Sequence, residues 1–150
     1  MDALVKKLNF KNHKDIIILN LPESLVEIKN TFAEISNVHV TPQSAERLDF
    51  ALVFVFNPQQ IADAIIMLEQ KLVEDSVLWF SYPKKSSKKF KCEIDRDHGW
   101  TVLGEHGYEP VRQVAVDEDF SALRFRKFHH IKSFTRNKEM ALSEAGKNRK

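Results

Sequence analysis

"LDFALVFVFNPQQIADAIIMLEQKL", residues 48–72, is the stretch of sequence that decides the fold. Its first part, residues 48–56, is apolar at almost every position. A strand with one face in water alternates apolar and polar residues, whereas a strand covered on both faces is apolar throughout. Residues 48–56 therefore predict a central strand with helices packed on both of its faces.

A helix is predicted directly after this strand. Asn57 stands in the capping position, Pro58 in the first helical position and Gln60 where a capping box has its glutamine. The apolar residues that follow recur at helical spacing: Ile61, Ile65, Leu68 and Leu72. Strand and helix together predict one unit of an α/β fold.

The segments before this unit repeat the alternation of strand and helix. Residues 15–22 form an apolar run that Pro22 ends, and they predict a first strand. The segment that follows has apolar residues at helical spacing and predicts a helix: Leu25, Ile28, Phe32 and Ile35. A brief second strand is predicted at 38–41.

The segments after the unit continue the pattern. Residues 77–82 predict another strand, which Pro83 stops. A third helix is predicted from Ile94 to about His106, with Gly107 directly after its end. This element would bring the basic segment between Pro83 and Ile94 to the start of a helix.

The last predicted elements form a hairpin within residues 109–128. Two strands are joined there by an acidic turn at 117–119, and the imperfect alternation of Val111, Val114 and Val116 indicates a bulge. Parallel strands need helical crossovers, and these crossovers are almost always right-handed. The order of elements thus predicts a three-layer α/β fold, a mostly parallel, doubly wound (Rossmann-like) sheet that ends in an antiparallel hairpin.

Length and composition bound the class of protein. The chain has 150 residues, 43% hydrophobic and 29% charged, which is typical of a soluble globular protein. We expect one domain over residues 1–130 and a flexible basic tail over 131–150. No apolar run is long enough for a membrane helix, the charged N-terminus does not suit a signal peptide, and the single Cys92 suits a reducing compartment. These features predict a cytoplasmic protein without a membrane partner.

Charge is unevenly placed along the chain. The net charge is +2, but the first 80 residues are acidic overall and the remaining residues are basic overall. Such asymmetry can steer an anionic partner to one side of a protein. The total charge is too small for an obligate nucleic-acid-binding protein.

Several segments carry a resemblance to known families. "DFALVFVF", "NPQQIADAIIMLEQKL" and "DSVLWFSYPK", followed by a helix and a hairpin, resemble the later half of a Rossmann-like methyltransferase. "VLWFSYPK", "IDRDHGW" and "PVRQVAVDEDFSALRFR" resemble a small family of uncharacterised bacterial proteins, a domain of unknown function, over about residues 10–130. The resemblance implies a methyltransferase-like fold and a bacterial cytoplasmic setting, and it implies no activity.

The cofactor motif of such folds is missing from the sequence. An adenosyl or dinucleotide cofactor needs a glycine-rich turn after the first strand, where the backbone approaches the ligand. Here the first strand runs into "LNLPES", and none of the four glycines follows a strand and opens a helix. We therefore predict no conventional Rossmann cofactor site and no cofactor.

Catalytic and metal-binding patterns are also missing. No G-x-S-x-G elbow is present, and Cys92 has no identifiable base beside it. His129 and His130 are adjacent, so on a strand they would face opposite ways and would not hold one metal ion. We predict no catalytic residue and no metal site.

The predicted ligand site lies at the carboxyl ends of the parallel strands, where open α/β sheets bind their ligands. Asn57 and Lys84 each follow a predicted strand, and Arg96 and His98 fall in the first turn of the third helix. We expect these cations to converge on an anionic small molecule, with Trp100 as an apolar wall. Each residue also has a structural explanation, because tryptophans are usually core residues and a lysine- and serine-rich run is often a solvated connection.

Nucleic-acid binding is the alternative interpretation of the same segment. Its lysines would neutralise phosphates while an aromatic ring stacks on a base: Lys84, Lys85, Lys88, Lys89, Phe90 and Lys91. Basic residues of the tail would add to this sequence-tolerant binding. Taken together, the sequence indicates a non-catalytic binding or adaptor domain whose partner it does not identify, with a divergent methyltransferase-like enzyme as a further alternative.

Overall fold

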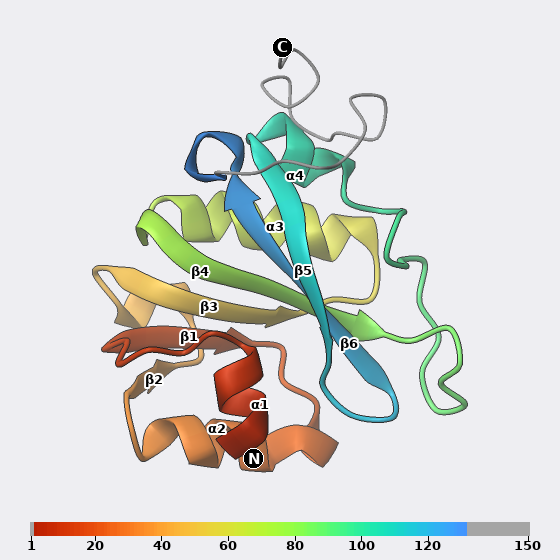
Figure 1. Ribbon diagram of the computed structural model, residues 1–150, viewed down its shortest axis with the longest axis horizontal. Helices are drawn as coiled ribbons and strands as arrows, with labels where there is room; N and C mark the ends of the chain where they lie inside the picture. The colour runs from red at the N-terminus through yellow and green to blue at the C-terminus, as the bar shows by residue number, and fades with distance from the viewer. Residues whose placement is uncertain (1, 132–150) are drawn as a thin grey trace.

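One six-stranded sheet organises the chain, with helices on both of its faces (Figure 1). The computed structural model describes residues 2–131. In spatial order the strands are β2 (Asn37–His39), β1 (Asp15–Leu19), β3 (Leu48–Phe54), β4 (Leu72–Pro83), β6 (Phe120–Lys127) and β5 (Tyr108–Ala115). The basic tail predicted over 131–150 lies, apart from Ile131, outside the described residues.

Strand directions confirm the predicted fold class. β2, β1, β3 and β4 pair in parallel, while β6 is antiparallel to both β4 and β5. The reversed strand β6 therefore lies between two strands that run the same way. The bulge predicted in the hairpin is present, as a register shift between Pro110 and Arg112. The sheet is mostly parallel, doubly wound and closed by an antiparallel hairpin, as expected.

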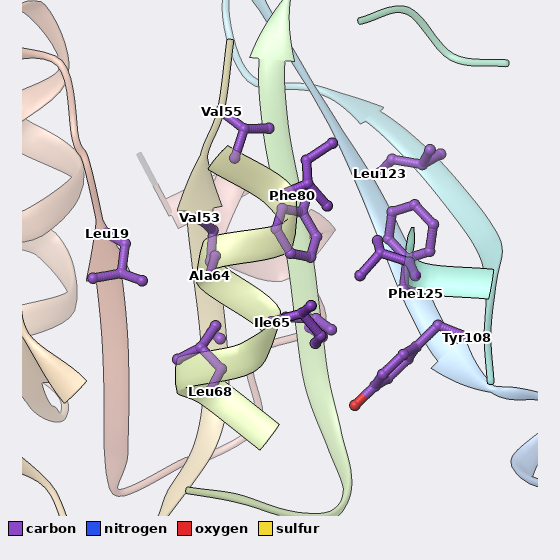
Figure 2. Close-up of a cluster of buried hydrophobic side chains, with 14 of the residues drawn as sticks. Leu19, Val53, Val55, Ala64, Ile65, Leu68, Phe80, Tyr108, Leu123 and Phe125 are labelled. Atoms are coloured by element: carbon purple, nitrogen blue, oxygen red, sulfur yellow. The ribbon is translucent and has the colours of Figure 1, made fainter. Parts of the chain in front are cut away.

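The helices form two layers. α1 (Asp2–Lys7) and α2 (Val26–Ala33) cover one face of the sheet, and α3 (Pro58–Glu69) and α4 (Thr101–Glu105) cover the other (Figure 1). Central strand β3 is apolar at all positions but Asp49 because it contributes to both cores: Phe50, Leu52 and Phe54 pack toward α1 and α2, Ala51 and Val53 toward α3 and α4. Figure 2 shows the second core, in which Ala64, Ile65 and Leu68 of α3 lie over the sheet.

Each layer holds one of the two tryptophans. Trp79 of β4 is fully buried toward α1, and its indole N–H donates to the carbonyl of Leu8 at 2.8 Å. Trp100 lies in the other layer, in ring contact with Phe80 and Phe125. Helix α1, which the sequence patterns did not predict, is thus attached to the sheet by a buried hydrogen bond.

Three predicted boundaries change in the structure. Residues 23–25 form a 3₁₀ turn before α2, and Ile35 follows the helix and is 51% exposed rather than part of its apolar face. The first strand ends at Leu19, before Pro22, because Asn20 turns the backbone into the left-handed region. Leu72 opens β4 and pairs with Leu48, so it does not belong to α3.

The predicted helix from Ile94 to His106 is wrong over its first half, since only Thr101–Glu105 is α-helical. The Asp95 carboxylate accepts a hydrogen bond from the Asp97 N–H at 2.9 Å, and Asp95 and His98 form an isolated β-bridge. Aspartate side chains compete with helix formation in this way. Gly99, with φ of +105°, then turns the chain before the short helix begins.

No helix among residues 2–131 combines the length and the apolar character that crossing a membrane requires.

Candidate functional site

The carboxyl edge of the parallel strands is the place where this fold offers a ligand site. β1, β3 and β4 end there at Leu19, Phe54 and Pro83. The chain runs from β1 to its neighbour β2 and then crosses back to β3 on the other side of β1, so the strand order reverses between β1 and β3. Ligands of doubly wound sheets bind outside the strand ends at such a reversal.

Asn20 lies at this reversal, directly after β1. Its φ of 58° supplies the left-handed turn for which a glycine is the usual residue, and asparagine adopts that conformation more readily than most side chains. Its side-chain amide donates to the Phe54 carbonyl at 3.3 Å and so bridges β1 and β3. The sequence analysis missed this residue, although an asparagine directly after an apolar run is a signal for such a turn.

The lysine-rich loop, residues 84–94, folds back over the ends of β4 and β6. The Lys84 N–H donates to the Asp119 carbonyl at 2.7 Å, and the Ser87 hydroxyl donates to the Asp119 carboxylate at 2.8 Å. Phe90 packs against Phe120 and Phe56, with ring centroids 5.0 and 6.1 Å apart. The loop is therefore attached to the sheet by its own contacts, which a purely solvated connection would not have.

A hollow of about 290 Å³ lies between the end of β4 and this loop. Its lining is Pro83, Lys84, Lys85, Ser87, Phe90, Lys91, Cys92 and Ile94. Three ammonium groups and a hydroxyl thus surround an apolar floor. Among the lysines of this lining, Lys85 forms an ion pair, because its Nζ lies 3.0 Å from the Asp95 carboxylate.

Two of the residues predicted to bind an anion are turned toward carboxylates instead. The Asp95 carboxylate lies 2.8 Å from Nδ1 of His98, and Arg96 Nε lies 3.6 Å from Asp97. The hydrogen bond from Lys85, with further hydrogen bonds from the Asp97 N–H and His98, holds the pKa of Asp95 well below its usual range. Lys84 lines the hollow, whereas Arg96 and His98 are not in its lining, and the helix that was expected to align the three residues is absent over 94–100.

Trp100 and Asn57, the other two residues of the predicted site, have structural partners. Trp100 is 2% exposed and donates to the Asp95 carbonyl at 2.8 Å, so it is a core residue rather than a pocket wall. Asn57 caps α3, accepting from the Gln60 N–H at 2.9 Å. Gln60 in turn accepts from the N–H of Phe56, the residue before the cap, so the predicted capping box is present with its return hydrogen bond shifted by one residue.

The nucleic-acid interpretation requires an aromatic ring that is free to stack on a base, and the structure does not leave Phe90 free in this way. Phe90 is half-buried between Phe56 and Phe120, so its ring does not stand free to receive a base. Lys88 and Lys89 are exposed and do not line the hollow. The lysines of the loop thus fall into a lining set and an outward set.

Cys92, also half-buried, donates a hydrogen bond from its thiol to the Ile94 carbonyl at 3.0 Å.

At the opposite, amino edge of the sheet the structure corrects the argument against a metal site. His129 and His130 are not on a strand but in a 3₁₀ turn, with their rings 4.1 Å apart. Both lie beside the Glu74 carboxylate, and one ligand atom from each of the three residues falls within 4.8 Å of the others. Adjacent histidines can therefore face the same point in this chain.

Comparisons with known proteins identify the fold. The chain is similar to the N-methyltransferase NodS from Bradyrhizobium japonicum WM9, with a TM-score of 0.53, 14% identity, and 83% of this chain and 93% of that chain covered. A SAM-dependent methyltransferase from Aquifex aeolicus gives a TM-score of 0.54 at 12% identity, covering 83% and 87% of the two chains. The chain has a methyltransferase fold.

The methyltransferase-like resemblance read from the sequence is thereby confirmed at the level of fold. Fibrillarin from Methanococcus jannaschii, a pre-rRNA processing protein, is similar too, with a TM-score of 0.50, 14% identity, and 78% and 67% covered. No family model matches the sequence. No curated protein matches it either. The resemblance to the small uncharacterised bacterial family stays a prediction.

The residues at the strand reversal do not fit the cofactor of this fold in its usual place. S-adenosylmethionine would need the backbone after β1 to approach it closely, which a side chain at that position prevents. Here the Asn20 amide spans β1 and β3, and Leu21 and Phe56 pack onto the core beneath. The hollow beside β4, by contrast, is open and bears polar groups.

Proposed function

We propose that this chain is a divergent methyltransferase-like domain that binds a small molecule with a carboxylate or phosphate group in the hollow between β4 and the lysine-rich loop. The likeness to methyltransferases favours a scaffold that holds a small ligand over one that only docks other proteins. The adaptor interpretation is therefore the weaker of the two. The single observation that carries the proposal is the lysine-lined hollow at the carboxyl edge.

The chemistry of the lining supports an anion with an apolar part. Lys84 is half-buried at the strand end, and a charge so placed interacts more strongly with a ligand than one in open water. Lys91 also contributes to the lining, whereas the Ser87 hydroxyl donates to the Asp119 carboxylate. Phe90 and Ile94 contribute the apolar surface. Lys85 is already paired with Asp95, so Lys84 and Lys91 are assigned the contact with the anion.

Thermal-shift measurements test this proposal. The panel contains inorganic phosphate, adenosine monophosphate and S-adenosylmethionine at low ionic strength. A ligand present at about a hundred times its Kd adds about 2.7 kcal/mol to the free energy of unfolding, a rise of roughly 5 °C or more in Tm for a chain of this size. We expect adenosine monophosphate or phosphate to raise Tm, and S-adenosylmethionine not to do so because the Asn20 side chain bridges β1 and β3 where its usual site has a glycine-rich turn.

Two matched double variants locate the binding. K84A/K91A removes two lining lysines, and K88A/K89A removes two outward lysines of the same loop with the same change in charge. The proposal expects the first variant to lose the shift and the second to keep it. Equal loss in both variants, with RNA binding that falls steeply as salt rises, would favour nucleic-acid binding instead. Stabilisation by S-adenosylmethionine that survives K84A/K91A would support a methyltransferase with an unconventional cofactor site.

A further inference from the structure

The amino edge of the sheet carries a second cluster of ligating groups, remote from the lysine-lined hollow. Glu74 lies near the start of β4, and His129 and His130 form the turn that follows β6. In Figure 1 this turn and the start of β4 lie on the side of the molecule away from the lysine-rich loop. The proposed function uses none of these three residues.

We propose that Glu74, His129 and His130 form a binding site for a divalent transition-metal ion, with Zn²⁺ as the ion they suit best. The two imidazoles suit Zn²⁺ better than Mg²⁺ or Ca²⁺, which prefer all-oxygen sites, and a carboxylate oxygen is a common additional ligand of zinc. Three protein ligands are the number found where zinc keeps an open fourth position.

The distances fit a tetrahedral ion with little movement. With bonds of about 2.0–2.1 Å, neighbouring ligand atoms of tetrahedral Zn²⁺ lie about 3.4 Å apart. Nε2 of His130 is 3.3 Å from Oε1 of Glu74, and Nε2 of His129 is 3.7 Å from the same oxygen. One ligand atom from each of the three residues lies within 4.8 Å of the other two, so a single ion can reach all three residues.

Electrostatics favours a metal ion over a simple ion pair. For both histidines to pair with Glu74 as cations, two imidazolium rings would have to stand 4.1 Å apart and repel each other. One divalent ion between neutral rings satisfies the same three groups. Two basic residues of β6 are paired with carboxylates, Arg126 with Asp75 and Lys127 with Glu69, which reduces their repulsion of a metal ion.

A hollow beside the cluster leaves room for a fourth ligand. Its volume is about 430 Å³, and Glu74, His129 and His130 all contribute to its lining. Tyr108 and Lys127 border the same space. Water, or an anion drawn to the ion, fits at the open position. The geometry is that of an accessible site rather than of a closed structural one.

Zinc titration of the full chain tests the proposal. Isothermal titration with Zn²⁺, in a non-chelating buffer and without a polyhistidine tag, should give one ion per chain. H129A/H130A and E74Q should each weaken binding about tenfold or more, because loss of a ligand costs at least as much as loss of a second-shell partner. Co²⁺ should give a visible absorption band in the wild type that both variants lose.

The matched control is His98→Ala. His98 is also an exposed histidine beside a carboxylate, but it lies at the other edge of the sheet. Its variant should bind Zn²⁺ like the wild type, and all variants should show the fold's circular dichroism. Equal zinc affinity in the wild type and H129A/H130A would overturn the site, as would a wild type that binds no Zn²⁺.

Discussion

The two tyrosines of the chain give a direct readout of burial at the residue scale. Tyr82 and Tyr108 both lie in the core under α3 and α4, and burial raises the pKa of each to about 12. A hydrogen bond from Gln113 to the Tyr82 hydroxyl, 3.0 Å long, partly opposes the shift in the pKa of Tyr82. The negative charge of Glu69 adds to the shift in the pKa of Tyr108.

We predict that neither tyrosine ionises at pH 10 in the folded protein. The folded state holds both phenolic protons more tightly than the unfolded state, whose pKa is about 10. The stability from the neutral hydroxyls is thus fully present below about pH 10 and is lost as pH rises toward 12. Ultraviolet absorbance of tyrosinate measures this titration. Ionisation of both groups near pH 10 without denaturant would contradict the prediction, and Gln113→Leu should raise the pKa of Tyr82 further.

Residue roles divide into those that local sequence determines and those that it does not. Asn57 was predicted as a cap, and it is one, because its partner Gln60 lies three residues away. Arg96 and His98 were predicted to face a ligand, but they lie beside Asp97 and Asp95. A charge pattern gives the type of group that is available and does not say which neighbouring carboxylate reaches it first.

At the scale of elements, α3 shows what capping contributes. Asn57 supplies the side-chain acceptor for the Gln60 N–H, and α3 buries Ile61, Ala64, Ile65 and Leu68 against the sheet. We predict that Asn57→Ala lowers the free energy of unfolding by about 1 kcal/mol, with Tm falling by about 2–4 °C. Asn57→Asp should keep the stability, since an aspartate caps as well and suits a helix N-terminus.

Urea unfolding followed by circular dichroism measures both variants. A change in midpoint with unchanged slope is expected for Asn57→Ala, because the surface exposed on unfolding stays the same. If Asn57→Asp were as destabilised as Asn57→Ala, the side chain would have a role other than capping.

Prediction of elements succeeded where the signals were local and failed where they were not. α3 was predicted with its cap because every signal lies within a few residues. The start of β4 was predicted five residues late, since residues 72–76 are strand only by pairing beside Leu48, across a bulge. The segment 94–100 looked helical by composition, yet hydrogen bonds of the Asp95 carboxylate hold it in turns.

At the scale of the whole molecule, the order of strands could be predicted only in part. Alternating strands and helices predicted a parallel sheet and its closing hairpin. The position of β6 between β4 and β5 depends on pairs far apart in sequence, such as Trp79 with Arg124. The carboxyl edge was predicted as the ligand site from the topology alone, and the predicted parallel arrangement of these strands is the one that the structure has. The residues that line its hollow depend on how the loop folds back, which periodicity does not encode.

The shared sheet predicts that both layers unfold together. Every central strand contributes to both cores, so neither layer of helices keeps its packing once the sheet is lost. The two tryptophans report separately on the unfolding of the two layers, because Trp79 belongs to the α1 and α2 layer and Trp100 to the α3 and α4 layer. In Trp100→Phe the fluorescence follows the first layer, and in Trp79→Phe it follows the second.

We predict that, within each single-tryptophan variant, fluorescence and far-ultraviolet circular dichroism give the same urea midpoint. Both variants should be less stable than the wild type, by about 1–3 kcal/mol for Trp79→Phe, which leaves the Leu8 carbonyl without its indole donor. The test is the coincidence of probes within a variant, so the loss of stability does not affect it. A fluorescence midpoint below the circular dichroism midpoint in Trp100→Phe alone would mean that α1 and α2 detach first. In that case the buried hydrogen bond from Trp79 would be too weak to couple the N-terminal layer to the sheet.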